Sequence, residues 1–166
     1  MTIRRSIFMT IQDPLLNYYE RITCSAQWKH FNRALAAELS VGLPPEENRQ
    51  LFARIGARVV EGLPVARCNT LEELQTAFNA QWEAIDWGFC TLQETGEHLS
   101  ITHVCSPLAM AFGPDEVDWS SGFFEGAYQT WFAAQGIPPE LRVRIDVPAE
   151  GNGASKVLLK LARSAS

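Results

Sequence analysis

The sequence lacks several features by which proteins are often assigned to a functional class. No apolar run approaches the length needed to span a bilayer, and no glycine-rich phosphate loop precedes a predicted helix. No two cysteines form a Cys-x-x-Cys pair. We interpret the four widely spaced cysteines as buried thiols of a cytoplasmic protein: Cys24, Cys68, Cys90 and Cys105.

An excess of positive charge is also absent. The chain has 14 Lys and Arg residues against 19 Asp and Glu residues, which gives a net charge of −5 at pH 7 and a pI near 5.2. A nucleic-acid partner would require a clustered basic face, so this composition argues against nucleic acid. It is compatible with a neutral partner such as a sugar, or with another protein.

The N-terminal residues do not have the pattern of a secretory signal. Their short apolar patch is interrupted by Gln12, Asp13 and Pro14, whereas a signal needs a longer apolar segment and a cleavage site with small residues. We therefore expect a cytoplasmic protein that keeps residues 1–22. Because this segment is rich in apolar side chains, we expect an arm that packs on the domain or on a neighbouring subunit.

The residues that are present predict a single folded domain over 23–166. With 166 residues, 46% of them hydrophobic, the chain can bury a proper core. Apolar side chains recur at three- and four-residue steps in four segments, which predicts helices. These helices are expected at about 25–41, 45–61, 69–85 and 119–135. The predicted inner faces of the first two are Trp28, Phe31, Leu35 and Leu39, and Leu51, Phe52, Ile55 and Val59.

Alternating apolar residues predict two β-hairpins. In the first, a two-residue turn between Glu94 and Glu97 would pair Leu92 with Leu99, and it would give the hairpin one apolar and one polar face. The same register pairs Cys90 with Ile101. The second hairpin is expected over 141–161, with its turn at 150–153.

The fold class predicted from these elements is α+β. We expect about four helices packed on a small antiparallel sheet made of the two hairpins. Gly122 and Gly126 lie one turn apart in the last predicted helix, where glycine costs about 1 kcal/mol against alanine. We expect that they admit the close approach of another backbone.

Residues that could carry chemistry do not converge in this arrangement. His103 and Cys105 share one face of the first hairpin whereas His98 lies on the other, which argues against a zinc site. A nucleophile at Cys90 or Cys105 with His103 as base would lack a third group to orient the imidazole. We expect no enzyme, no metal and no cofactor.

Carboxylates that could form an acid–base pair lie near turns and helix starts, where acids ordinarily cap helices. They are Asp86, Asp115, Glu116, Asp118 and Glu125. Aromatic residues at helical spacing are expected in the core. Trp119, at a loop-to-helix turn, is the least core-like tryptophan and is a candidate contact for a sugar or a partner.

Three motifs, in order and spacing, resemble the family of the cellulose synthase D subunit. They are Ala-Ile-Asp-Trp-Gly at 84–88, Leu-Ser-Ile-Thr-His at 99–103, and Phe-Glu-Gly-Ala-Tyr-Gln-Thr-Trp at 124–131. The third is the strongest. The resemblance runs from about Phe52 to Arg163 and includes the closing Arg-x-Asp-Val and Val-Leu-Leu-Lys strands.

The resemblance implies a non-catalytic accessory subunit of bacterial cellulose biosynthesis and secretion, a process of biofilms. It implies a ring-shaped homo-octamer, a tetramer of dimers, that acts as a cytoplasmic scaffold near the inner membrane. The implied partners are the cellulose synthase complex, a proline-rich scaffold protein and the nascent glucan chain. The expected oligomer contacts are Phe8, Tyr18, Tyr19, Gly122 and Gly126, and the expected glucan or partner contact is Trp119.

Two alternatives stay open. The first is a sensory α+β domain that encloses a small apolar ligand, for which a large closed pocket between the last helix and the sheet would be evidence. The second is a hydrolase that uses the acids at 115–118.

Overall fold

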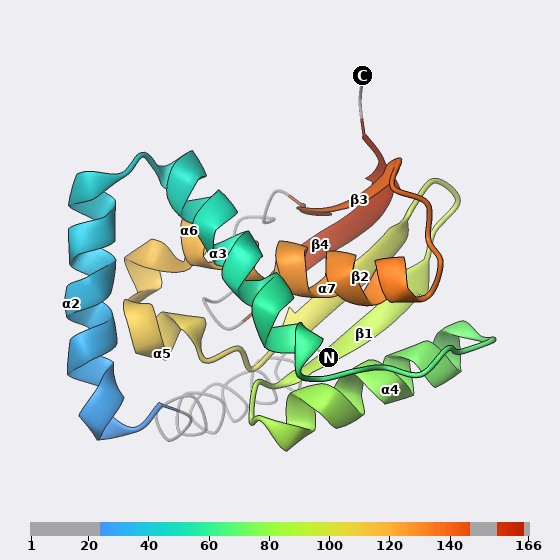
Figure 1. The fold of residues 1–166 in the computed structure, drawn as a ribbon, viewed down its shortest axis with the longest axis horizontal. Coiled ribbons are helices and arrows are strands. Elements are labelled where there is room, and N and C mark those ends of the chain that lie inside the picture. The colour runs from blue at the N-terminus through green and yellow to red at the C-terminus, as the bar shows by residue number, and fades with distance from the viewer. Residues whose placement is uncertain (1–23, 147–155, 165–166) are drawn as a thin grey trace, which may run out of the picture.

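Four strands form one antiparallel sheet in the order β1-β2-β4-β3 (Figure 1). The computed structural model describes residues 24–146 and 156–164, so the predicted N-terminal arm and the turn of the second hairpin lie outside the described residues. The α+β class and the antiparallel sheet are as predicted. The strands are β1 Phe89–Glu94, β2 Leu99–Val104, β3 Leu141–Ile145 and β4 Lys156–Arg163.

The longer helices begin and end close to the predicted bounds. Between β2 and the last long helix, however, lie three short helical segments, and that helix begins at Gly122 rather than at Trp119. The helices are α2 Ala26–Gly42, α3 Pro45–Glu61, α4 Leu71–Ala84, α5 Leu108–Phe112, the 3-10 segment η1 Pro114–Glu116, α6 Val117–Ser120 and α7 Gly122–Ala134.

The predicted register of the first hairpin is wrong by two residues. Leu92 pairs with Ile101, and Cys90 pairs with His103. A four-residue loop replaces the two-residue turn, because Thr95 donates from its backbone N–H and its hydroxyl to the His98 carbonyl, at 2.9 and 2.7 Å. A shift of two residues leaves every side chain on its predicted face.

Helices α4 and α7 lie on one face of the sheet, and α3 crosses α7 on the side away from it (Figure 1). The interface between α4, α7 and the sheet is strongly aromatic. Phe78 stacks on Trp131 with ring centroids 4.7 Å apart, and Trp82 lies against Tyr128 at 5.7 Å. These side chains are almost completely buried, so the prediction that aromatic residues at helical spacing lie in the core is confirmed for α4 and α7.

The glycines of α7 allow the close crossing with α3. A Cβ at Gly126 would lie 1.7 Å from the carbonyl oxygen of Ala53, and one at Gly56 of α3 would lie 1.9 Å from that of Phe123. The predicted close approach of a second backbone is therefore confirmed, and this backbone belongs to the same chain. Oligomer contacts through Gly122 and Gly126 stay a prediction.

Side chains of α4 cover the outer edge of β1. Asn79 accepts a hydrogen bond from the Cys90 N–H at 2.6 Å and donates to the Cys90 carbonyl at 2.9 Å. One turn earlier, Gln75 accepts from the Leu92 N–H at 2.7 Å. The amide side chains thus occupy backbone groups that would otherwise pair with a further strand.

The opposite edge of the sheet is covered in the same way by α7. Gln129 accepts from the Val143 N–H and Glu125 accepts from the Ile145 N–H, both at 2.8 Å. Both edge strands therefore use a pair of helical side chains four residues apart. This arrangement blocks the sheet from extending by strand addition at these positions.

Candidate functional site

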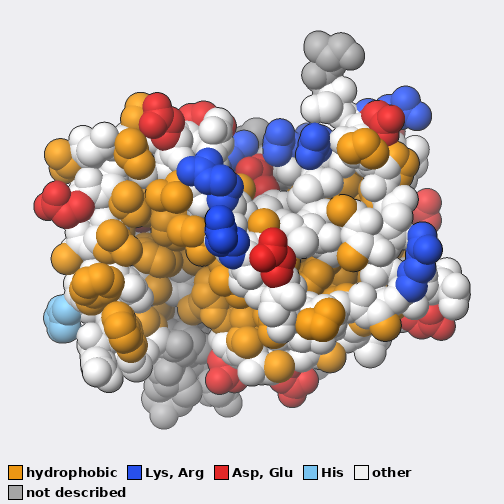
Figure 2. Space-filling model, viewed as in Figure 1, with side chains coloured by type: hydrophobic (Ala, Val, Ile, Leu, Met, Phe, Trp, Pro, Cys, Tyr) orange, Lys and Arg blue, Asp and Glu red, His pale blue; other side chains and the backbone are white. Residues whose placement is uncertain are grey.

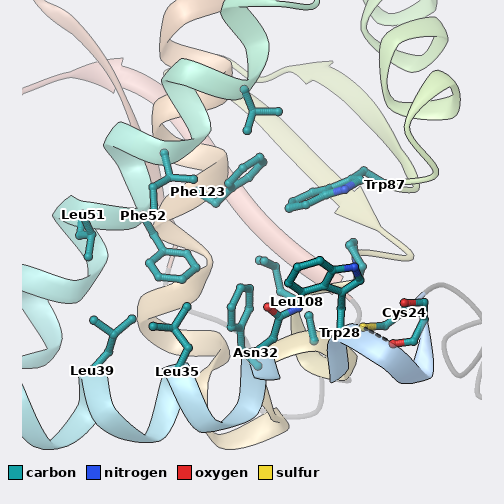
Figure 3. A pocket seen from close by; sticks show the side chains of 16 residues that line it. Cys24, Trp28, Asn32, Leu35, Leu39, Leu51, Phe52, Trp87, Leu108 and Phe123 are labelled. Carbon is teal, nitrogen blue, oxygen red and sulfur yellow. Dashed lines mark hydrogen bonds between the residues drawn. The ribbon is translucent and has the colours of Figure 1, made fainter. Parts of the chain in front are cut away.

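An apolar groove lies between α2, α3 and α5, and we call it the α2–α3 groove. Its volume is about 460 Å³. Figure 3 shows the side chains of Leu35 and Leu39 projecting from α2 toward Phe52 of α3, and that of Trp28 projecting toward Trp87. Phe123 and Trp87 lie at the inner end of the groove (Figure 3). The groove is open to solvent, and Figure 2 shows hydrophobic side chains gathered over this part of the surface.

The α2 face that the periodicity predicted as buried is largely exposed, and this part of the prediction is wrong. Trp28 is 57% exposed, Phe31 is 59% exposed and Leu35 is 41% exposed. Across the groove, Ile55 and Val59 of α3 are also exposed. An exposed apolar surface built from two helices is typical of a face that is covered by another molecule or segment.

Helix α2 is held mainly at its C-terminal end. Asn48, which is almost completely buried, donates from its side-chain amide to the Leu39 carbonyl at 3.0 Å. Ser40 donates to the Glu116 carboxylate at 2.8 Å. Asn48 is a neutral polar residue inside the core, and its amide joins the first turn of α3 to the end of α2. The groove therefore has a defined wall even though the apolar side chains of α2 are exposed.

A buried polar network lies between α4, α7 and the sheet. The His103 Nε2 atom is 2.8 Å from the Trp87 carbonyl oxygen, and its Nδ1 atom is 2.7 Å from the Tyr128 hydroxyl. The Trp82 Nε1–H donates to the same hydroxyl at 3.1 Å. Because a carbonyl only accepts, Nε2 carries the proton, and Nδ1 accepts from Tyr128. Every proton in this chain of hydrogen bonds has a partner when the imidazole is neutral.

The pKa values agree with this arrangement. Burial lowers the pKa of His103 to about 4 and raises the pKa of the Cys90 thiol to about 11. Burial also holds the pKa of Tyr128 well above its ordinary value. His103 and Cys90 are thus neutral near pH 7, and both imidazole nitrogens are already engaged. The network is suited to fixing the core rather than to proton transfer or nucleophilic attack.

The candidate sugar-stacking residue Trp119 lies inside the core. Its side chain is 5% exposed and packs edge-on against Phe52, with ring centroids 4.8 Å apart. Its Nε1–H donates to the Glu116 carboxylate. The interpretation of Trp119 as the least core-like tryptophan is therefore wrong, because α6 turns the indole inward. Its burial gives no support to a glucan contact.

The candidate acids have different roles in the structure. Glu125 accepts from Arg49 Nε at 3.2 Å in addition to the β3 backbone, and Glu116 joins α2 to α6. Asp118 lines a second cavity of about 340 Å³ that also contains Asp146, Arg49 and Lys156. The acids that are engaged therefore act as hydrogen-bond acceptors between elements, whereas Asp118 faces an open cavity.

Among residues 24–146 and 156–164, no cluster of three or more His, Cys, Asp or Glu side chains could hold a metal ion. All four cysteines lie in these ranges, and none of them forms a disulfide. The prediction of buried thiols holds for Cys90, whereas Cys24, Cys68 and Cys105 are partly exposed. Of the helices in the described ranges, none has both the length and the apolar character needed to cross a membrane.

The described residues thus define an α+β domain with an apolar surface groove and a closed polar core. The family model for the D subunit of cellulose synthase matches residues 14–158. Since this match covers most of the chain, the chain belongs to the family of the cellulose synthase D subunit, and it has a role in cellulose biosynthesis. The comparison with curated proteins gives no match.

Proposed function

We propose that this protein is a non-catalytic, self-associating scaffold subunit of cellulose biosynthesis, located in the cytoplasm next to the synthase complex at the inner membrane. The observation that carries this proposal is the α2–α3 groove, with its exposed aromatic and aliphatic side chains. Apolar surface of this kind provides most of the free energy of permanent subunit association. The sequence family supports the link to cellulose.

The occupant that we propose for the groove is a second copy of this chain. Cys24, the first described residue, lines the groove, so residue 23 joins the described part of the chain at the groove. Their sequence includes Phe8, Tyr18 and Tyr19, which are aromatic side chains of the kind enriched in interface cores. In this proposal the arm of one copy lies in the groove of the next, and repetition of the contact builds the ring-shaped octamer that the family resemblance implies.

In the assembled state the scaffold would order neighbouring synthase complexes through a proline-rich partner, so that glucan chains leave in parallel. An assembly of identical subunits presents the same binding surface many times, which raises the effective concentration of any tethered partner. This role needs no catalytic group of the chain itself.

The test of self-association is the molar mass of the purified full chain, measured by light scattering. We expect an oligomer for the wild type and a much smaller species for Leu35→Asp, because a charge would be placed in the centre of the apolar contact. Arg33→Asp, on an exposed position of the same helix, is the matched control and should keep the wild-type mass. A wild-type monomer would contradict the proposal, as would an unchanged mass for Leu35→Asp.

One observation favours a second candidate, the ligand-binding domain. The groove volume of about 460 Å³ falls in the range of small-molecule sites. The space between α7 and the sheet, however, is filled by fully buried side chains such as Phe124 and Tyr128, so the ligand would have to bind in the open groove. Native mass spectrometry distinguishes the two candidates, since a monomer with a bound small molecule would favour the ligand-binding domain over the self-associating scaffold.

A further inference from the structure

The face of the sheet opposite α4 and α7, which we call the outer face, is mostly polar, and most of its cations lie toward one end. None of the described helices packs on it. From the strand register, its residues on β1 and β2 are Phe89, Thr91, Gln93, Ser100, Thr102 and Val104, and those on β4 and β3 are Lys156, Leu158, Lys160, Ala162, Arg142 and Arg144. Uncharged hydrogen-bonding side chains thus cover the first two strands except at one end, where Phe89 and Val104 lie, and cations lie on the last two strands.

A shallow cavity of about 440 Å³ lies at the cationic end. Its lining includes Arg142, Arg144, Lys160 and Arg163 against a single carboxylate, that of Glu97. Lys160 is partly neutralised by Asp146, at 3.2 Å. Among the described residues, none of the three arginines has a carboxylate within ion-pair distance. Four of the 14 cationic residues therefore gather in one hollow of a protein whose net charge is −5.

We propose that this cationic end of the outer face binds an acidic, extended peptide segment of a partner protein. The charge contrast would orient such a segment, because the acidic remainder of the surface repels it while the hollow attracts it. Arginine is suited to this task, since its planar guanidinium can bind a carboxylate with two parallel hydrogen bonds.

The spacing of the arginines favours a peptide over a single phosphate group. Arg142 and Arg144 are two residues apart on one strand, a separation of about 7 Å, and Arg144 lies opposite Lys160 on β4. This repeat matches alternate side chains of an extended chain. The cations also project from a flat sheet, and no long helix begins at this hollow to direct backbone N–H groups at a phosphate.

The peptide would lie on the face of the sheet and would not add to its edge. Gln129 and Glu125 already occupy the outer N–H groups of β3 at Val143 and Ile145. Recognition would therefore depend on side-chain charge, and we expect it to be strongly sensitive to salt. This surface is distinct from the α2–α3 groove, so the failure of one proposal leaves the other standing.

The experiment measures fluorescence anisotropy of a labelled ten-residue peptide of alternating Glu and Ser with the full-length chain at low salt. We expect saturable binding, and we expect affinity to fall at least about tenfold for the double variant Arg142→Glu/Arg144→Glu. The neutral variant Arg142→Ser/Arg144→Ser should show a smaller loss, and it guards against a folding defect. An otherwise identical peptide of Gln and Ser should not bind.

The matched control is Arg54→Glu/Arg58→Glu, the same change of charge on exposed positions of α3. It should bind the Glu–Ser peptide like the wild type. Equal loss in both double variants would overturn the proposal, because the attraction would then come from overall charge. Displacement of the peptide by millimolar inorganic phosphate would also overturn it in favour of an anion site. A changed molar mass of Arg142→Glu/Arg144→Glu would point instead to a second copy as the occupant.

Discussion

The α2–α3 groove and the outer face of the sheet are both left open by the described residues, but their chemistry is opposite. The groove is lined by aromatic and aliphatic side chains, whereas the outer face has hydroxyl, amide and guanidinium groups. Apolar contacts hold subunits together with little dependence on salt, and charged contacts mainly provide orientation and specificity. Our two proposals therefore differ in chemistry, with self-association through the first face and partner binding on the second.

The core between these faces keeps them independent. Both sheet edges are covered by helical side chains, and α3 is locked onto α7 by glycines on both helices. A change on one face should thus leave the other intact, unless the core itself is disturbed. The predictions below begin with the core and end with the surface.

The largest effect is expected from Gly126→Leu. The new side chain would overlap the Ala53 carbonyl, so α3 must move away from α7, and we expect a loss of more than about 3 kcal/mol in the free energy of unfolding. Because α3 is one wall of the groove, self-association should fail as well. Urea denaturation measures the loss, with Gly42→Ala as the control, since nothing lies within 4 Å of its Cβ. An unchanged melting temperature for Gly126→Leu would show that the crossing is not tight.

The second largest effect is expected from protonation of the buried His103 side chain at acidic pH. The folded-state pKa is about 4, below the ordinary value of 6.5, so the unfolded chain binds the proton more tightly. Stability should therefore fall as the pH drops from 6.5 toward 4, by about 3 kcal/mol in total, and this slope should disappear above pH 7.

His103→Gln isolates this contribution from that of the carboxylates. Glutamine can donate to the Trp87 carbonyl and accept from Tyr128 but does not titrate, so its stability curve should be flatter than that of the wild type between pH 6.5 and 4. His98→Gln, outside the core, should retain the wild-type slope. Equal slopes for all three proteins would exclude the neutral buried imidazole as the cause of the loss of stability in acid.

Gln75→Ala should have a smaller effect. It leaves the Leu92 N–H at the edge of β1 without its 2.7 Å partner, and we expect a loss of about 1 kcal/mol. Hydrogen exchange should show faster exchange at Leu92 and no change at Val143 on the other edge, which Gln129 still covers. Uniform acceleration at both edges would mean that the two helices do not protect them separately.

The smallest structural effect, and the sharpest contrast between the faces, is expected from salt. Raising NaCl from about 0.05 to about 0.5 M shortens the Debye length from about 14 to about 4 Å. We expect the Glu–Ser peptide to dissociate from the outer face while the oligomer mass stays constant. A mass that falls with salt would assign the assembly to charged contacts instead of the groove.

The sequence was sufficient to predict the elements and faces that depend on local periodicity. Leu74, Phe78 and Trp82 are buried as expected, and the hairpin faces are correct even though the register is not. The register depends on the hydrogen bonds that Thr95 makes in the loop, which alternation of apolar residues does not encode. Similarly, periodicity marks α2 as amphipathic but does not tell what covers its apolar side, and here no described element covers Trp28 or Phe31.

The parts of the site that the sequence did not reveal depend on residues far apart in the chain. His103 and Tyr128 meet through the packing of α7 on the sheet, and α6 turns Trp119 inward. A signal was nevertheless available for the sheet edges. Gln75 and Asn79, like Glu125 and Gln129, are polar side chains four residues apart on helices that pack against an edge strand. Such a pair next to a strand indicates that the two side chains bind the free backbone groups of an edge strand.

The most direct test of self-association through the groove is hydroxyl-radical footprinting of the full chain over a range of concentrations. Trp28 and Phe89 have similar exposed fractions in one chain, 57% and 50%, but lie at different surfaces. We predict that Trp28 is protected in the concentrated protein and becomes reactive on dilution to the monomer, while the reactivity of Phe89 does not change. A reactivity of Trp28 that stays constant with concentration would contradict the account.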